Sequence, residues 1–210
     1  MFFRDKKPIR PIEKSVAATK TFVTSVLAGL SLLAEWREDA ALQAAVAALP
    51  EAFAKAIALD WSPLSARLSR ASSAFVLGRG PGFAIANEAA LKFKETSAIQ
   101  AEAFSSAEVR HGPMALIDEH YPLLVFAPRG AEQAGLISLA AEMRQRGARV
   151  LLAAPDDVLD RDLTLSRAEH PSLDPILAIQ SFYVMAAGLA LARGMNPDQP
   201  RHLSKVTRTH

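Results

Sequence analysis

The sequence predicts an α/β protein in which a parallel sheet is flanked by helices. The first observation is a short β-type run, AFVLG (residues 74–78), which is followed by a glycine-rich turn and a strongly helix-forming segment at 84–98. The second is that this order repeats. An apolar run at 121–130 precedes an amphipathic segment at 131–148, and another apolar run follows at 149–155. Strands that alternate with helices form parallel sheets covered on both faces.

The rest of the chain divides into a helical segment before this unit and a tail after it. Residues 1–15 are rich in Pro and Lys and are expected to be irregular, whereas 16–70 carry apolar residues at helical spacing and an Ala-rich stretch. We assign 71–194 to the α/β unit, which ends with a helix that is apolar nearly all round and is therefore expected to be buried. Residues 195–210 contain two prolines and no hydrophobic periodicity, so other contacts must hold this tail if it is ordered.

Composition limits the classes of function. The chain has 210 residues, of which 50% are hydrophobic and 22% charged, and its net charge is +2, all typical of a globular domain. It has no stripe of Lys and Arg interleaved with aromatic residues, and no apolar run that resembles a signal sequence or a membrane span. We therefore expect neither nucleic-acid nor membrane binding. The lack of cysteine excludes disulfides, thiolate metal sites and a cysteine nucleophile in these residues, and it fits a cytoplasmic protein.

The glycine turn is the first candidate site. Gly78, Gly80 and Gly82 allow a ligand to approach the backbone closely, and the helix that follows directs free N–H groups toward the turn, as in anion sites. The spacing fits the dinucleotide-binding fingerprint poorly. A tight strand-to-helix turn without any ligand explains the same residues equally well.

Charged residues supply the other candidates. Glu88, Lys92 and Glu95 are spaced by four and three residues, so they share one face of a helix. The ordinary alternative is a solvated ladder of ion pairs, worth roughly a few tenths of a kcal/mol. His111 stands on a rigid turn before a Gly-Pro pair, although a lone histidine is most often a structural hydrogen-bonding residue. Lys205 would ordinarily be a solvated charge. No His, Asp or Glu cluster has metal-ligand spacing, so we predict no metal site.

Three separated motifs, in order, carry a resemblance to a known family. The stretch ALKFKETSAIQAEAFSSAEVRHGPMALID (residues 90–118) resembles the second lobe of the SIS (sugar isomerase) fold in the isomerase half of glucosamine-6-phosphate synthase. EKSVAATKTF at 13–22 and NPDQPRHLSKVT at 196–207 agree with the same family. The forms SVAATK, AEAFSSAE and NPDQP are more similar to the SIS-type glucosamine-6-phosphate deaminases. The resemblance implies a flavodoxin-like, doubly wound sheet, with 71–194 as the second lobe.

The resemblance also implies roles for individual residues. Glu95 corresponds to the carboxylate that moves a proton between C1 and C2 of an open-chain hexose or hexosamine 6-phosphate. His111 corresponds to the histidine that helps to open the pyranose ring and that is donated by the other subunit of a homodimer. Lys205 corresponds to a lysine that approaches the sugar carbonyl carbon from a tail folded over the substrate. Substrate contacts are implied for four further residues, namely Lys92, Val16, Ala17 and Ala18.

These residue types suit that chemistry. A carboxylate can serve as the base for both carbons, a histidine titrates near neutrality, and a desolvated lysine can act on a carbonyl or imine, so no cofactor is needed. Two features depart from the family pattern. The Ser-Gln-Ser-Gly loop with which a first lobe grips the phosphate does not occur here, and Gln100 stands where relatives usually have histidine. We therefore expect 16–70 to follow a missing first lobe, whose loss would remove much of the substrate-binding free energy.

Three functions remain open from the sequence. The first is conversion of glucosamine 6-phosphate to fructose 6-phosphate and ammonia. The second is the isomerase part of a glutamine–fructose-6-phosphate aminotransferase, which would need a glutamine-cleaving cysteine that these residues do not supply. The third is a sugar-phosphate-binding SIS domain that dimerises without turnover.

Overall fold

The protein folds around one parallel sheet, as the sequence predicts. The structure, a computed structural model, describes residues 13–205. The strands of the sheet are β1 (Ser73–Gly78), β2 (Gln100–Ser105), β3 (Pro122–Phe126), β4 (Arg149–Ala154) and β5 (Leu163–Thr164). Their order in the sheet is β2-β1-β3-β4-β5, and every neighbouring pair is parallel. This is the flavodoxin-like order, in which the chain changes direction across the sheet between β1 and β3.

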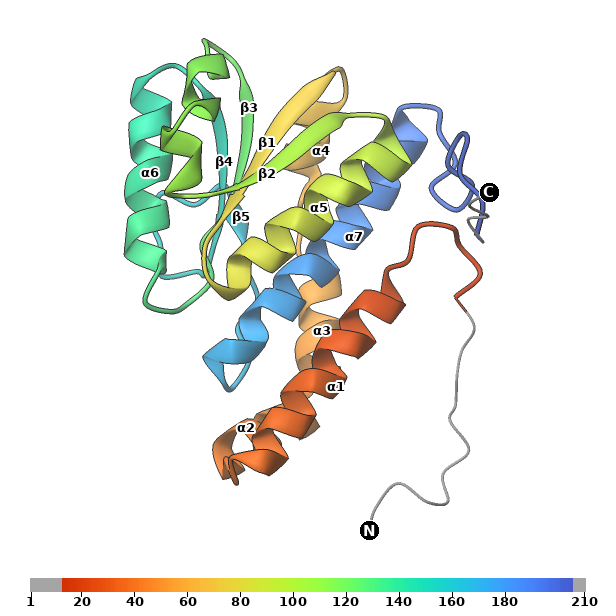
Figure 1. Cartoon of the computed structure of the whole chain (residues 1–210), viewed down its shortest axis with the longest axis vertical. Helices are drawn as coiled ribbons and strands as arrows, with labels where there is room; N and C mark the ends of the chain where they lie inside the picture. Colours follow the sequence, from red (N-terminus) through yellow and green to blue (C-terminus); the bar gives the residue numbers. More distant parts are fainter. Residues whose placement is uncertain (1–12, 206–210) are drawn as a thin grey trace.

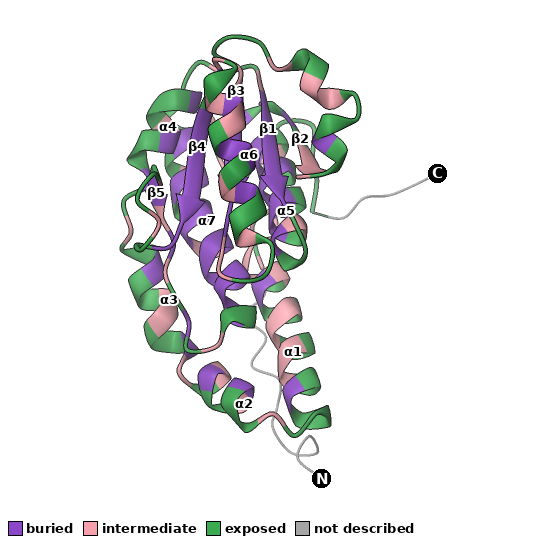
Figure 2. Cartoon of the chain, turned by 90° about the vertical axis from the view of Figure 1, so that its left-hand side faces the viewer, coloured by how far each residue is buried: buried purple, intermediate pink, exposed green. Residues whose placement is uncertain are grey.

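Helices cover both faces of the sheet (Figures 1 and 2). One face packs against α4 (Ser62–Leu68), α5 (Pro81–Ser97) and α7 (Asp174–Ala192), and the other packs against α6 (Gln133–Gln145). Alternate residues of each strand point to opposite faces, so in β1 Val76 joins the α5/α7 core whereas Phe75 joins the α6 core. Burial on both faces explains why β1, β3 and β4 are continuous apolar runs.

The N-terminal helices form an extension beside α7. They are α1 (Lys20–Trp36), α2 (Ala40–Ala47) and α3 (Leu49–Ile57), and their inner faces share a small core with the start of α7. Pro50 lies in the first turn of α3, where its missing N–H costs no hydrogen bond. The Ala-rich stretch is therefore two helices rather than one.

The last helix, α7, passes through the centre of the molecule. By length and composition, the helical span at 171–192 could cross a membrane, and the bent pair of α2 and α3 would pass the same test together. However, 67% of the most apolar window of the span at 171–192 is buried inside the protein. This is the pattern of a helix in the core of a domain, and it agrees with the burial that its sequence predicts.

Short 3₁₀ turns complete the described chain. They are η1 (Glu108–Arg110), η2 (Pro113–Leu116) and η3 (Pro171–Leu173). The turns η1 and η2 follow β2 and lie beside α6, where Arg110 forms an ion pair with Glu142 at 2.6 Å. After α7 the tail turns back toward residues 13–19 at the start of α1 (Figure 1). The last five residues of the predicted tail, 206–210, lie outside the described residues, as do 1–12 of the lead-in.

Candidate functional site

The charged face of α5 is buried rather than solvated. Lys92 is only 3% exposed, and its Nζ lies 2.6 Å from Glu95 Oε2 and 3.4 Å from Glu88 Oε1. The Glu88 side chain is 7% exposed and that of Glu95 19%. A solvated ion-pair ladder is therefore the wrong description of these three residues. A lysine ammonium held between two carboxylates compensates charges that could not otherwise remain in a poorly solvated place.

Tyr183 of α7 completes this group. Its hydroxyl donates a 2.7 Å hydrogen bond to Glu88 Oε1, the oxygen that also faces Lys92. Burial raises the pKa of the Glu88 carboxyl, although the hydrogen bond from Tyr183 and the charge of Lys92 oppose that shift. Burial and the neighbouring Glu88 carboxylate raise the pKa of Tyr183 well above its ordinary value, so the phenol remains a donor. The result is a continuous chain of polar contacts from Tyr183 to Glu95.

The segment before α1 is fixed by a carboxylate. Glu13 accepts hydrogen bonds from the backbone N–H groups of Thr19, at 3.0 Å, and Thr21, at 2.9 Å, where α1 begins. Burial of Glu13 would raise its pKa, but the hydrogen bonds from Thr21 and Thr19 outweigh this and lower it to about 2. An ionised carboxylate at a helix N-terminus satisfies free donors and the helix dipole together.

The C-terminal tail lies against this same segment. The Val16 N–H donates to the Asp198 carbonyl at 3.3 Å, and Lys205 Nζ donates to the Ser15 carbonyl at 2.6 Å. Two residues of the predicted site, Val16 and Lys205, thus lie where the tail after α7 contacts the segment before α1. Of the neighbouring pair, Ala17 is buried and Ala18 is half-buried.

Glu95 opens onto a hollow under the tail. We call it the tail hollow. It has a volume of about 430 Å³ and lies between the end of α5 and residues 194–202. Glu95 and Thr96 line it from α5, and Asn196, Gln199 and His202 line it from the tail. This volume is within the range of small-molecule sites. Glu95 therefore combines a buried cationic partner with access to a space that the tail covers.

His111 lies elsewhere. It is exposed at the end of η1 and lines a separate, open hollow with Phe83, Phe104 and Glu108. Glu95 stands just before β2 and His111 stands beyond its other end, so the six-residue strand alone separates them by roughly 20 Å at ~3.3 Å per residue. Within one chain these two predicted site residues do not come together.

The glycine turn is accounted for without a ligand. A Cβ on Gly78 would lie 2.3 Å from the Gly82 carbonyl oxygen, so close packing of strand against helix requires glycine there. The N–H groups of Gly82 and Phe83 donate within the turn itself, to Arg79 and Gly80 carbonyls, both at 3.0 Å. The donors expected to form an anion cradle are thus already used. The turn behaves as a strand-to-helix connection.

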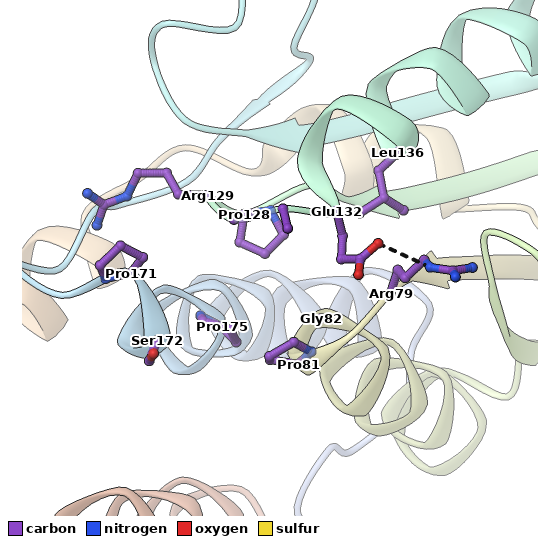
Figure 3. A pocket seen from close by; sticks show the side chains of 12 residues that line it. Arg79, Pro81, Gly82, Pro128, Arg129, Glu132, Leu136, Pro171, Ser172 and Pro175 are labelled. Carbon is purple, nitrogen blue, oxygen red and sulfur yellow. Dashed lines mark hydrogen bonds and ion pairs between the residues drawn. The ribbon is translucent and has the colours of Figure 1, made fainter. Parts of the chain in front are cut away.

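A second hollow lies beside this turn, between the carboxyl ends of β1 and β3 (Figure 3). It has a volume of about 270 Å³. Its two arginines are both paired with carboxylates: Arg79 with Glu132 at 3.1 Å, and Arg129 with the buried Asp174 at 2.7 Å. Among the described residues, therefore, no unpaired basic side chain lines this hollow. Within residues 13–205, no group of three or more His, Asp or Glu side chains is arranged to hold a metal ion.

The comparison with known families decides the assignment. The SIS domain model matches residues 67–187, which include the whole sheet and most of α7. The chain belongs to the SIS domain family. The match covers the charged face of α5, so the SIS assignment applies directly to the residues that form the candidate site.

The relatives of this SIS chain are sugar-phosphate enzymes. The glutamine–fructose-6-phosphate aminotransferase (isomerizing) of Mycolicibacterium smegmatis is 36% identical over 213 residues, which cover 92% of this chain and 34% of that protein. A crystal structure from Silicibacter pomeroyi DSS-3, provisionally designated a phosphosugar isomerase, is 45% identical with a TM-score of 0.82. It matches 90% of this chain over 57% of its own. The chain thus spans about a third of the curated relatives it matches.

A second solved structure agrees with the aminotransferase likeness. The C-terminal domain of the glucosamine-fructose-6-phosphate aminotransferase from Francisella tularensis is 27% identical, with a TM-score of 0.73. The match covers 90% of this chain and 58% of that domain. Homology to the isomerase half of the aminotransferases, which the sequence motifs predict, is confirmed.

Sequence patterns do not predict the roles of two further residues, Tyr183 and Glu13. Tyr183 is a hydroxyl-bearing residue on a helix that is otherwise apolar nearly all round. Such a residue must find a hydrogen-bond partner when it is buried, and this was the available signal. Glu13 lies in a motif that the resemblance used, but its capping role depends on where α1 begins, which the apolar periodicity did not fix.

Proposed function

We propose that this SIS chain carries the proton-transfer centre of a phosphosugar isomerase, and that its reaction is conversion of glucosamine 6-phosphate to fructose 6-phosphate and ammonia. One observation supports the proposal above the others. Glu95 has a buried ammonium 2.6 Å away on one side and the tail hollow on the other. A catalytic base must remain ionised while it faces an uncharged C–H group of the substrate, and this arrangement meets both needs.

The proposed chemistry needs one base that serves two carbons. Glu95 removes the proton from C2 of the open-chain amino aldehyde, and the electrons of that C–H bond form the C1–C2 double bond. The π electrons of the C1 carbonyl move to O1, which takes a proton from water, and the product is an enolamine. Return of the proton to C1 gives the C2 imine, and water then hydrolyses the imine to fructose 6-phosphate and ammonia. Lys92 compensates the charge of Glu95 while it is ionised, and Glu88 with Tyr183 holds the ammonium of Lys92 in place.

His111 enters this proposal through a second copy of the chain. The strand β2 separates it from Glu95 within one chain, so a dimer that brings the η1–η2 turn of one copy to the tail hollow of the other would supply the acid–base group for ring opening. The exposure of His111 supports this role because a side chain donated across an interface must be free on its own subunit.

Lys205 is the proposed partner of the sugar carbonyl. Its ammonium now binds the Ser15 carbonyl, and the tail lies against the SVAATK segment through Val16 and Asp198. A hydrogen bond to a backbone carbonyl can be exchanged for a substrate oxygen at small net cost. The tail would then close over the sugar from the side opposite α5.

A second candidate is the isomerase part of a glutamine–fructose-6-phosphate aminotransferase. The 36% identity to the enzyme of Mycolicibacterium smegmatis favours it. Both reactions use the same proton transfer between C1 and C2, so the network around Glu95 fits them equally. The deaminase releases ammonia, whereas the aminotransferase takes it from glutamine. An assay that follows ammonia therefore separates the two reactions.

The first experiment measures ammonia release from glucosamine 6-phosphate by the protein. Release with equimolar fructose 6-phosphate supports the deaminase. Formation of glucosamine 6-phosphate from fructose 6-phosphate and glutamine, with a separate glutamine-cleaving subunit added because these residues include no cysteine, would instead support the aminotransferase. If fructose 6-phosphate and glucose 6-phosphate interconvert without ammonia, the deaminase is excluded and the simpler isomerase remains. A protein that binds these sugars but converts none of them would contradict catalysis altogether.

A mixing experiment tests the dimer. Glu95→Gln and His111→Ala homodimers are each expected to be inactive, whereas mixed dimers contain one site with both groups intact. Recovery of activity on mixing, up to about half of the wild-type value per mixed dimer if sites act independently, supports donation across the interface. Two inactive variants that remain inactive after subunit exchange has been verified would contradict it.

A further inference from the structure

A third hollow lies at the amino edge of the sheet. We call it the amino-edge hollow. It has a volume of about 370 Å³ and lies between the end of α4 and the starts of β1, β3 and β4. Its polar lining consists mainly of six side chains: Arg67, Arg70, Ser72, Ser73, His120 and Arg149. Among the residues that the structure describes, no carboxylate lines it. The residues of the proposed proton-transfer centre are not among those that line it.

The arginines of this hollow are unusual for the chain. Elsewhere arginines are mostly neutralised: six of them form ion pairs with Asp or Glu, namely Arg79, Arg110, Arg129, Arg144, Arg146 and Arg167. Across residues 13–205, Arg67, Arg70 and Arg149 form no side-chain ion pair or hydrogen bond. Three unpaired guanidinium groups thus face one concavity. An anion bound there would be attracted by several of these groups at once.

The backbone around the hollow is compatible with a negative charge. The end of a helix exposes carbonyl oxygens that would repel an anion. At the end of α4, however, the Arg193 guanidinium donates hydrogen bonds to the carbonyl oxygens of Leu68, at 3.1 Å, and Ser69, at 2.9 Å. Asp118 and Glu119 precede His120, but neither lines the hollow, and the Glu119 side chain packs on Gly147 instead. Within residues 13–205, the hollow is therefore positive and has no acidic side chain in its lining.

We propose that the amino-edge hollow is a binding site for a small ligand that carries a phosphate or pyrophosphate group. Guanidinium groups bind phosphate oxygens through paired N–H donors, and serine hydroxyls and histidine supply further donors at a polar site. The volume fits a small metabolite. The proposal is independent of the proposed reaction because Glu95, Lys92 and the tail hollow take no part in it.

The test is calorimetric titration of the protein with inorganic pyrophosphate. The Arg67→Gln/Arg70→Gln variant and the Arg149→Gln variant are each expected to weaken binding by about tenfold or more, since each removes charge-assisted hydrogen bonds. Arg37→Gln is the matched control because Arg37 is exposed at the end of α1 and forms no ion pair within the described chain. It should bind pyrophosphate like the wild type. Added salt should weaken wild-type binding.

Several results would overturn the proposal. These are a wild-type protein without saturable binding, equal affinities in all four proteins, or affinity lost in Lys205→Ala but kept in the arginine variants. The last would place the anion beside Lys205 rather than in the amino-edge hollow. A parallel titration with a short single-stranded RNA separates small ligands from polymers. If RNA binds through the same arginines far more tightly than pyrophosphate, the ligand class is wrong.

Discussion

Replacement of Lys92 by methionine gives the sharpest test of the buried network. Methionine keeps the length of the aliphatic stem but removes the ammonium that lies 3.4 Å from Glu88 and 2.6 Å from Glu95. Glu88, at 7% exposure, would then carry a negative charge with no cation beside it. Loss of one partner from a buried ion pair costs about 3–5 kcal/mol. The Glu95 side chain is 19% exposed and can recover part of its solvation, so Glu88 dominates the cost.

The assay is urea unfolding followed by circular dichroism. At an m-value of about 2 kcal/mol/M, the midpoint should fall by roughly 2 M. The double variant Lys92→Met/Glu88→Gln removes both charges and should recover about 2 kcal/mol of that loss, because a neutral pair of similar size needs no compensation. Two results would refute the charge argument. One is a loss of less than about 1 kcal/mol in the free energy of unfolding of Lys92→Met. The other is a loss in the double variant that equals the sum of the losses in Lys92→Met and Glu88→Gln.

Two further predictions concern stability. Glu13→Gln should cost about 1 kcal/mol at neutral pH through loss of the charged cap on α1. The folded pKa of about 2 lies below the ordinary 4.5, so this wild-type advantage should vanish as pH falls through that window, and a pH-independent difference would contradict it. Arg129→Met should cost about 3–5 kcal/mol because Asp174 is 1% exposed. Arg79→Met, the control, breaks only the exposed pair with Glu132 and should cost under about 1 kcal/mol; equal losses would contradict the reasoning.

The sheet was predictable where burial on both faces left a continuous apolar run. β1, β3 and β4 carry such runs, and the sequence predicts all three. The sequence does not predict β2, because this edge strand buries only Ala101 fully and its sequence, QAEAFS, mixes small apolar and polar residues. β5 has two residues, too few for any periodic signal.

The sequence predicts how the charged residues of the site are spaced, but it does not predict that they are buried. Intervals of four and three residues placed Glu88, Lys92 and Glu95 on one helical face. Whether that face meets water depends on the packing of α7, which supplies Tyr183 from 95 positions away in the sequence. A contact between residues so far apart in the sequence cannot be predicted from local sequence patterns. The separation of His111 from Glu95 follows from β2, a strand that the sequence pattern does not predict.

The central claim is that Glu95 moves a proton between C1 and C2 of the sugar. The most direct measurement is deuterium incorporation at these carbons from heavy water during turnover of the sugar phosphate, followed by NMR. Wild-type protein and Glu51→Gln, which alters an exposed glutamate on α3, should incorporate deuterium alike. Glu95→Gln should show no incorporation while keeping the wild-type free energy of unfolding to within about 1 kcal/mol. Wild-type exchange in a folded Glu95→Gln protein would contradict the account.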